Sequence, residues 1–137
     1  MPKIQRFEDL IAWQKARVLA NNIYALTRKS MFARDFGLRN QITEAAGSSM
    51  HNIAEGFDAG YDAEFARFLK LARRSASEVQ SELYLALDAG YITEDELKNA
   101  YAVAVEVKKL INGMLAYLNK KVNNRNNYST NDYSTKN

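Results

Sequence analysis

A seam of apolar side chains between residues 97 and 118 constrains the fold more than any other feature of the sequence. Its members follow one another at steps of three and four residues, the spacing that places side chains on one face of an α-helix. A second seam of this kind lies between residues 65 and 86, and both are typical of helices that pack side by side. The seams are Leu97, Ala100, Ala104, Val107, Ile111, Met114 and Leu118, and Phe65, Leu69, Ala72, Ala76, Val79, Leu83 and Ala86.

Two further helices are expected before these seams. The first runs from about Glu8 to Lys29, with acidic residues at its start and basic residues at its end, as the helix dipole favours. The second begins after Asp35, whose side chain suits an N-cap, and ends at Gly56, a residue type that commonly stops helices. Residues 30–34 form a short connection between them.

Local signals also delimit the two helices that carry the seams. Asp62 is expected to cap the third helix, and Gly90 to end it. Thr93 followed by Glu96 forms a capping box, which starts the fourth helix. Pro2 is the only proline in the sequence, so none of the four helices meets a forced break.

Four long helices with short connections predict an all-α fold, an antiparallel up-down-up-down four-helix bundle over residues 1–121. In this arrangement the first and fourth helices lie side by side, as do the second and third. Residues 122–137 are rich in Asn, Ser and Thr and lose the periodicity, so they are predicted to form a disordered tail.

Composition and charge restrict the classes of function. The chain has no cysteine, which excludes a disulfide framework, a thiol nucleophile and a cysteine metal site. No apolar run suits a signal region or a membrane span, so a cytoplasmic protein without membrane contact is expected. The net charge of +3 is uneven, because residues 1–43 and 97–137 each carry +5 whereas residues 44–96 carry −7. A split of this size can steer charged partners.

Polar residues occupy the inward stripe of the second helix between Ser48 and Gly56. A metal site is excluded by ligand count, since di-iron bundles need two Glu-x-x-His pairs and the single histidine, His51, follows Ser48 at that spacing. A triad of Ser48 or Ser49 with His51 and Glu55 is disfavoured, because close neighbours along one helix do not converge as a nucleophile and its base do. We therefore expect no catalytic residue, no metal and no cofactor.

Two interpretations of these polar residues remain. They form either a ligand site or structural layers that fix how helices pair, at some cost in stability. Pairing the second and third helices as a hairpin places the polar residues of the third near residues 39–45, which favours two separate layers. The residues assigned to these structural polar layers are Gln41, Ser49, Asn52, Glu55, Ser75 and Glu78.

Several separate motifs resemble those of a known family. They are Phe7-x-Asp9-Leu10-x-x-Trp13-Gln14-Lys15-Ala16, Ile23-Tyr24, Phe36-Gly37-Leu38-x-x-Gln41-Ile42, Ser49-x-x-Asn52-Ile53-Ala54-Glu55-Gly56, Ser75-Ala76-x-Glu78 and Gly90-Tyr91-Ile92. Over residues 7–118 the chain is similar to the four-helix-bundle proteins encoded in intervening sequences of bacterial 23S ribosomal RNA genes.

The resemblance implies a left-handed bundle, a ring-like homopentamer and no catalytic residue. It also implies kinship with the accessory bundle protein of diversity-generating retroelements, which is thought to bind nucleic acid and a reverse transcriptase. The chain departs from its relatives at Thr43-Glu44, where similar proteins often carry basic residues.

Two functions from different classes follow. In the first, a non-enzymatic homo-oligomer, a pentamer by the resemblance, binds RNA or DNA through basic faces of the first and fourth helices. Self-association is expected because the apolar helix faces exceed what one bundle can bury. In the second, the oligomer is a scaffold that docks a protein partner and binds no nucleic acid. The candidate nucleic-acid contacts are Arg28, Lys29, Arg67, Lys70, Arg73, Arg74, Lys108, Lys109, Lys120 and Lys121.

Overall fold

The computed structural model describes residues 3–134, and the side chains of residues 3–124. Within that range the prediction of an all-α fold with four long helices is confirmed. No helix of this part of the chain is both long and apolar enough to cross a membrane. The elements are the 3-10 turn η1 (Phe7–Asp9) and the helices α1 (Ile11–Thr27), α2 (Ser30–Arg34), α3 (Phe36–Asp58), α4 (Asp62–Asp88) and α5 (Glu94–Ser134).

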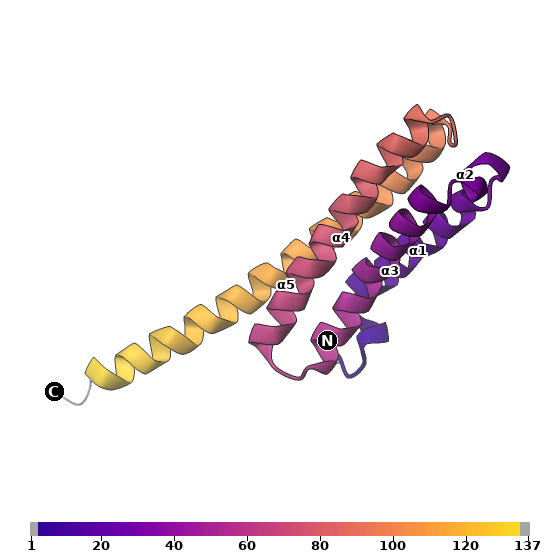
Figure 1. Ribbon diagram of the computed structural model, residues 1–137. Coiled ribbons are helices and arrows are strands. Elements are labelled where there is room, and N and C mark those ends of the chain that lie inside the picture. Colours follow the sequence, from indigo (N-terminus) through magenta and orange to yellow (C-terminus); the bar gives the residue numbers. More distant parts are fainter. Residues whose placement is uncertain (1–2, 135–137) are drawn as a thin grey trace.

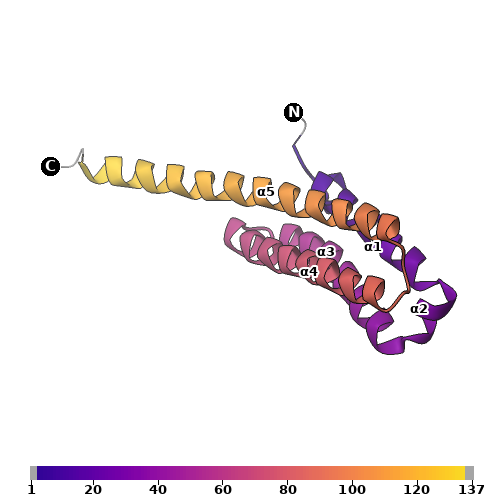
Figure 2. The ribbon, with the colours of Figure 1, turned by 90° about the horizontal axis from the view of Figure 1, so that it is seen from above.

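The four long helices form one bundle in which each packs against two others (Figures 1 and 2). α3 packs against α4, α4 against α5, α5 against α1, and α1 against α3, so the circuit of contacts closes. The turn between α3 and α4 and the turn between α4 and α5 lie at opposite ends of the bundle (Figure 1). The positions of these turns agree with the predicted up-down-up-down order. This order and the left-handed sense of the bundle stay predictions.

Both apolar seams face the interior of the bundle. Every member of the α5 seam is buried except Met114, which is half-buried and packs against the core. Every member of the α4 seam is buried except Phe65, which is placed in the same way. Fully burying a leucine- or valine-sized side chain contributes about 1.5–3 kcal/mol, so the two seams supply much of the stability of the fold.

The first helix is shorter than expected. Glu8 and Asp9 belong to η1, and α1 extends only from Ile11 to Thr27. Phe7 packs edge-on against Trp13, with ring centroids 5.1 Å apart. This contact folds η1 back onto the start of α1.

Gly56 lies inside α3, and the prediction that it stops this helix is wrong. The helix continues to Asp58, and Gly60, with φ +86°, follows its end. Gly56 is buried, and a Cβ added there would lie 2.6 Å from the Cβ of Phe68. Its role is therefore to let α3 and α4 approach each other closely, because a larger residue would collide with the facing helix.

The two ends of α4 differ from each other in how well the sequence indicated them. Asp62 is the first residue of the helix, not its cap, since Tyr61 holds the cap position without a side-chain hydrogen bond. The predicted end at Gly90 is confirmed, with φ +78°. The N–H of Gly90 donates to Leu87 O and that of Tyr91 donates to Ala86 O, both at 2.9 Å, which is the hydrogen-bond pattern of a Schellman motif.

The expected short connection contains the helix α2, which closes one end of the bundle. Its Phe32 is completely buried and stacks against Tyr91, with ring centroids 5.3 Å apart. The hydroxyl of Tyr91 donates to Asp35 Oδ2 at 2.9 Å. Asp35 is the N-cap of α3, as predicted, because its Oδ1 accepts from the N–H of Leu38 at 3.1 Å. One aspartate therefore joins the start of α3 to the turn before α5.

The backbone of α5 stays helical to Ser134, beyond the boundary expected at Lys121. Its last part projects past the other helices (Figures 1 and 2). The division into a bundle over residues 1–121 and a disordered tail over 122–137 stays a prediction, and residues 135–137 lie outside the described residues.

Candidate nucleic-acid interface

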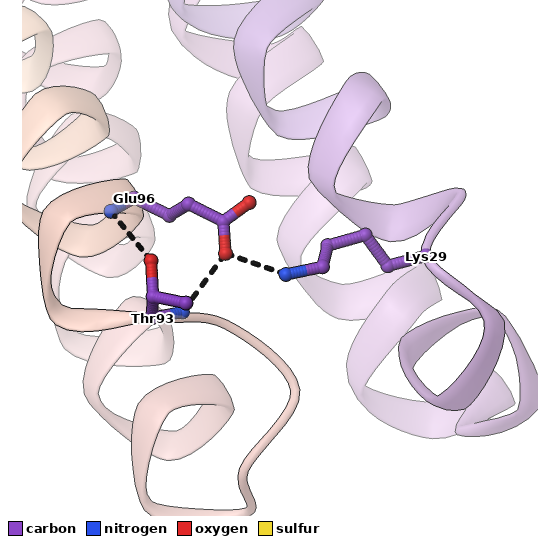
Figure 3. A network of polar contacts seen from close by, with 3 residues as sticks. All are labelled: Lys29, Thr93 and Glu96. Carbon is purple, nitrogen blue, oxygen red and sulfur yellow. Dashed lines mark hydrogen bonds and ion pairs between the residues drawn. The ribbon is translucent and has the colours of Figure 1, made fainter.

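Lys29, one of the ten candidate basic residues, is part of a structural network at the start of α5 (Figure 3). Glu96 Oε1 accepts from the N–H of Thr93 at 2.9 Å and from Lys29 Nζ at 2.5 Å. Thr93 Oγ1 accepts from the N–H of Glu96 at 3.1 Å, so the predicted capping box is confirmed. The hydrogen bond from Lys29 is the main cause that lowers the pKa of Glu96. The charge of Lys29 is therefore neutralised by its partner.

Two more candidates are neutralised in the same way. Arg67 donates to both carboxylate oxygens of Glu64, at 2.9 and 3.0 Å, and these bonds lower the pKa of that carboxyl. Lys121 forms an ion pair with Asp62 at 3.3 Å, which joins α5 to the start of α4. These lysine and arginine side chains add little net charge to the surface.

Two basic residues reach across the contact between α4 and α5 and bind neutral partners. Arg73 Nη1 donates to Asn112 Oδ1 at 2.8 Å. Lys108 Nζ donates to Gln80 Oε1 at 2.9 Å. An amide oxygen satisfies a donor without cancelling its charge, so both cations are held in place and remain positively charged.

Lys70 extends this row along α4. It lies three residues before Arg73 and is exposed, and both line a groove between α4 and α5. Residues spaced by three or four along α4 lie on one side of the helix, next to the buried seam. We call the set Lys70, Arg73, Gln80, Lys108 and Asn112 the α4–α5 basic row.

The basic side chains of the first helix differ in compensation. Lys15 pairs with Glu106 at 3.0 Å, whereas Arg17 lies over the ring of Trp13 at 5.8 Å, a contact that leaves its charge in place. The candidates held by neutral partners, Arg73 and Lys108, lie on α4 and α5, and a basic face on the first and fourth helices stays a prediction. The remaining candidates, which are all exposed, are Arg28, Arg74, Lys109 and Lys120.

The residues assigned to structural polar layers do not share one environment. Ser49 is buried, and its hydroxyl donates to Ala46 O at 2.7 Å. Asn52 is half-buried, and its Nδ2 donates to Ser48 O at 2.8 Å. Both bonds stay within α3, because a polar side chain on a helix can satisfy itself on the preceding turn. Ser75 is half-buried, whereas Gln41, Glu55 and Glu78 are exposed. A role of this set in helix pairing stays a prediction.

The serine, histidine and glutamate side chains of α3 lie in different environments. Ser49 is buried and bonded to its own helix, Ser48 is half-buried, and His51 and Glu55 are exposed. Among the described residues, no group of three or more histidine, cysteine, aspartate or glutamate side chains could hold a metal ion.

An acidic cluster between α3 and α4 escaped the sequence analysis. Burial, followed by the nearby charges of Glu78 and Glu44, raises the pKa of Glu82 to about 7. Glu82 Oε2 is shielded from water and accepts no hydrogen bond from the part of the chain that the structure describes. The available signal was the spacing of Glu78 and Glu82, since like charges four residues apart on a helix repel. α4 thus carries opposite charges toward its two neighbours.

The family model of the 23S rRNA-intervening sequence proteins matches residues 8–113, from η1 into α5. The chain belongs to this family. The family resemblance found in the sequence motifs is thereby confirmed, while the pentamer and the nucleic acid that it implies stay predictions. The comparison with curated proteins gives no match.

A solved structure is similar to this 23S rRNA-intervening sequence protein. It is the crystal structure of a protein with unknown function from the S23 ribosomal protein family of Bacteroides thetaiotaomicron. The two share 24% sequence identity with a TM-score of 0.70, and the alignment covers 77% of this chain and 98% of that chain. At this identity the similarity supports the bundle fold alone.

Proposed function

We propose that the protein is a non-enzymatic, homo-oligomeric nucleic-acid-binding protein that contacts the sugar–phosphate backbone along the α4–α5 basic row. The observation that carries this proposal is the row of Lys70, Arg73 and Lys108, none of which forms an ion pair within residues 3–124. Lysine and arginine that are free of carboxylates can bind phosphates and release counterions. Phosphate contacts carry no sequence information, so we expect binding with little sequence preference.

Self-association is supported by an exposed apolar stripe on α1. Ile11 and Val18, seven residues apart on one side of the helix, are 66% and 43% exposed. Large apolar side chains repeated at this spacing are the pattern of helix–helix contacts. In the homopentamer that the resemblance implies, five copies of a chain of charge +3 would carry +15, which would strengthen binding to a polyanion.

The proposal is tested by fluorescence anisotropy with a structured RNA and a duplex DNA over a range of salt concentrations. The wild type should bind at low salt and weaken as salt rises. The triple variant Lys70→Ala, Arg73→Ala, Lys108→Ala should lower the slope of log K against log salt by up to about 2.7 on duplex DNA, at about 0.9 for each lost phosphate contact. Absence of wild-type binding to either probe at low salt would refute the proposal.

A charge-matched control separates the effect of the α4–α5 basic row from the effect of net charge. The triple variant Lys29→Ala, Arg67→Ala, Lys121→Ala removes the same formal charge, but from side chains that carboxylates already neutralise. It should change the slope of log K against log salt far less than the triple variant of the basic row does. Equal losses of binding in the two triple variants would show that total charge, and not the α4–α5 basic row, determines binding.

The oligomer is tested by size-exclusion chromatography with light scattering. We expect a multimer for the wild type and a smaller species for Ile11→Glu or Val18→Glu, because each places a charge on the exposed stripe of α1. A monomer mass for the wild type would contradict self-association.

A further inference from the structure

A groove of about 680 Å³ lies between the first half of α4 and the second half of α5. Most of its lining is apolar, with Ala63 and Ala66 on the α4 side and Leu115, Ala116 and Val122 on the α5 side. The distance at which two helices pack depends on the side chains at their contact, and alanines permit a close approach. The groove therefore has the small side chains that close packing of a third helix requires.

The charges around this groove that no opposite charge compensates have one sign. Asp62 and Lys121 form an ion pair at one end, which leaves no net charge there. Lys70 is exposed, and Arg73 donates to the neutral Asn112, so both cations keep their charge at the rim. The groove thus combines an apolar floor with uncompensated positive charge.

α5 supplies a second observation. It continues past the groove to Ser134, and its last part has no neighbouring helix from the same chain (Figures 1 and 2). Isolated helices shorter than about 12–15 residues are marginally stable in water, so a projecting helical end gains stability from a helix laid against it. Val122, which is exposed, lies where the groove passes into this projection.

We propose that the groove binds an amphipathic α-helix of a partner protein, one with an apolar stripe flanked by acidic residues. Helices of this kind insert apolar side chains spaced by three or four residues into a groove between helices. Acidic flanks would face Lys70 and Arg73, whereas basic flanks would place like charges together. The proposal goes beyond nucleic-acid binding, because its ligand is a protein segment that the apolar floor recognises.

The test uses three designed, fluorescently labelled helical peptides and the full chain, with binding measured by anisotropy. One peptide has a leucine stripe with glutamate flanks, the second has the same stripe with lysine flanks, and the third is a scrambled form of the first. We expect the glutamate-flanked peptide to bind at least about tenfold more tightly than the other two. Equal binding of the glutamate- and lysine-flanked peptides, or no binding of either, would overturn the proposal.

Variants assign the binding to the groove. Ala116→Trp and Ala63→Trp fill it from exposed positions on opposite walls, and each should weaken the glutamate-flanked peptide about tenfold. The double variant Lys70→Glu, Arg73→Glu should instead favour the lysine-flanked peptide. Lys108→Ala is the control, since Lys108 does not line the groove, and it should leave peptide binding unchanged while it weakens nucleic-acid binding. Unchanged peptide binding in both tryptophan variants would contradict the proposal.

Other occupants of the groove would give different results. If Ala116→Trp lowers the mass of the oligomer in light scattering, the groove belongs to a second copy of this chain and the proposal is wrong. If the same variant abolishes duplex DNA binding, the groove belongs to nucleic acid, and the proposal is again wrong. The expected result is an unchanged mass, unchanged DNA binding and a weakened peptide.

Discussion

Replacing Glu82 by glutamine should stabilise the folded protein at about pH 8 and leave its stability nearly unchanged at about pH 4. The side chain is half-buried, and its Oε2 accepts no hydrogen bond from the described residues. Burial and the charges of Glu78 and Glu44 raise its pKa from the ordinary value of 4.5 to about 7. The ionised carboxylate is therefore destabilising in the folded state, and a neutral amide of the same shape removes this effect.

The pH dependence follows from proton binding in the two states. Below pH 4.5 the Glu82 carboxyl is protonated in both the folded and the unfolded chain. Between pH 4.5 and about 7 the unfolded chain releases the proton while the folded chain retains it, so the free energy of unfolding falls as pH rises. The full difference in pKa corresponds to roughly 3 kcal/mol. Water reaches part of the side chain and screens its charge, so we expect a measured effect of about 1–2 kcal/mol.

The assay is urea denaturation followed by circular dichroism at several pH values, at a fixed protomer concentration because the protein is expected to associate. The difference between Glu82→Gln and the wild type should grow from near zero at about pH 4 to about 1–2 kcal/mol at about pH 8. Glu55→Gln is the matched control, because Glu55 is an exposed glutamate of the neighbouring helix α3. A stability difference for Glu82→Gln that is the same at both pH values would refute the reasoning.

Three further predictions concern the fold, and thermal unfolding measures each. Gly56→Ala should lower stability by about 1–2 kcal/mol, because the added Cβ would collide with the facing helix. Gly113→Ala should raise stability by about 0.5–1 kcal/mol, because a Cβ added there has nothing within 4 Å. A gain in stability at both sites would contradict the close approach of α3 and α4. Thr93→Ala should cost about 1 kcal/mol through the lost cap of α5, and no change would contradict the role of the capping box. Phe32→Ala should cost about 3–5 kcal/mol, since this buried ring anchors α2, and a loss below about 1 kcal/mol would contradict that role.

The sequence predicted the long helices because their signals are local. Each signal depends on residues within a few positions of each other. These signals are the apolar seams of α4 and α5, the cap at Asp35, the capping box at Thr93 and the stop at Gly90. Gly56 was misassigned for the opposite reason, since the space it occupies is set by Phe68 on another helix. α2 was missed as a helix because five residues are too few to show periodicity.

The candidate surface was less predictable, because charge compensation depends on pairs that are distant in the sequence. Lys29 and Glu96 are 67 residues apart, and Arg73 and Asn112 are 39 apart. All ten basic residues therefore looked equivalent in the sequence, and only the structure separates those bound to carboxylates from those bound to amides. Glu82 was overlooked because its environment includes Glu44 of α3.

The opposite charges on the two sides of α4 give the protomer an electrostatic polarity perpendicular to the axis of that helix. Lys70 and Arg73 lie on the side that faces α5, and Glu78 and Glu82 on the side near Glu44. A polyanion approaching by diffusion would turn the molecule so that the α5 side leads, before any contact forms. Such pre-orientation acts on the rate of association, and it fades once the Debye length falls below about 10 Å, at ionic strengths above about 0.1 M.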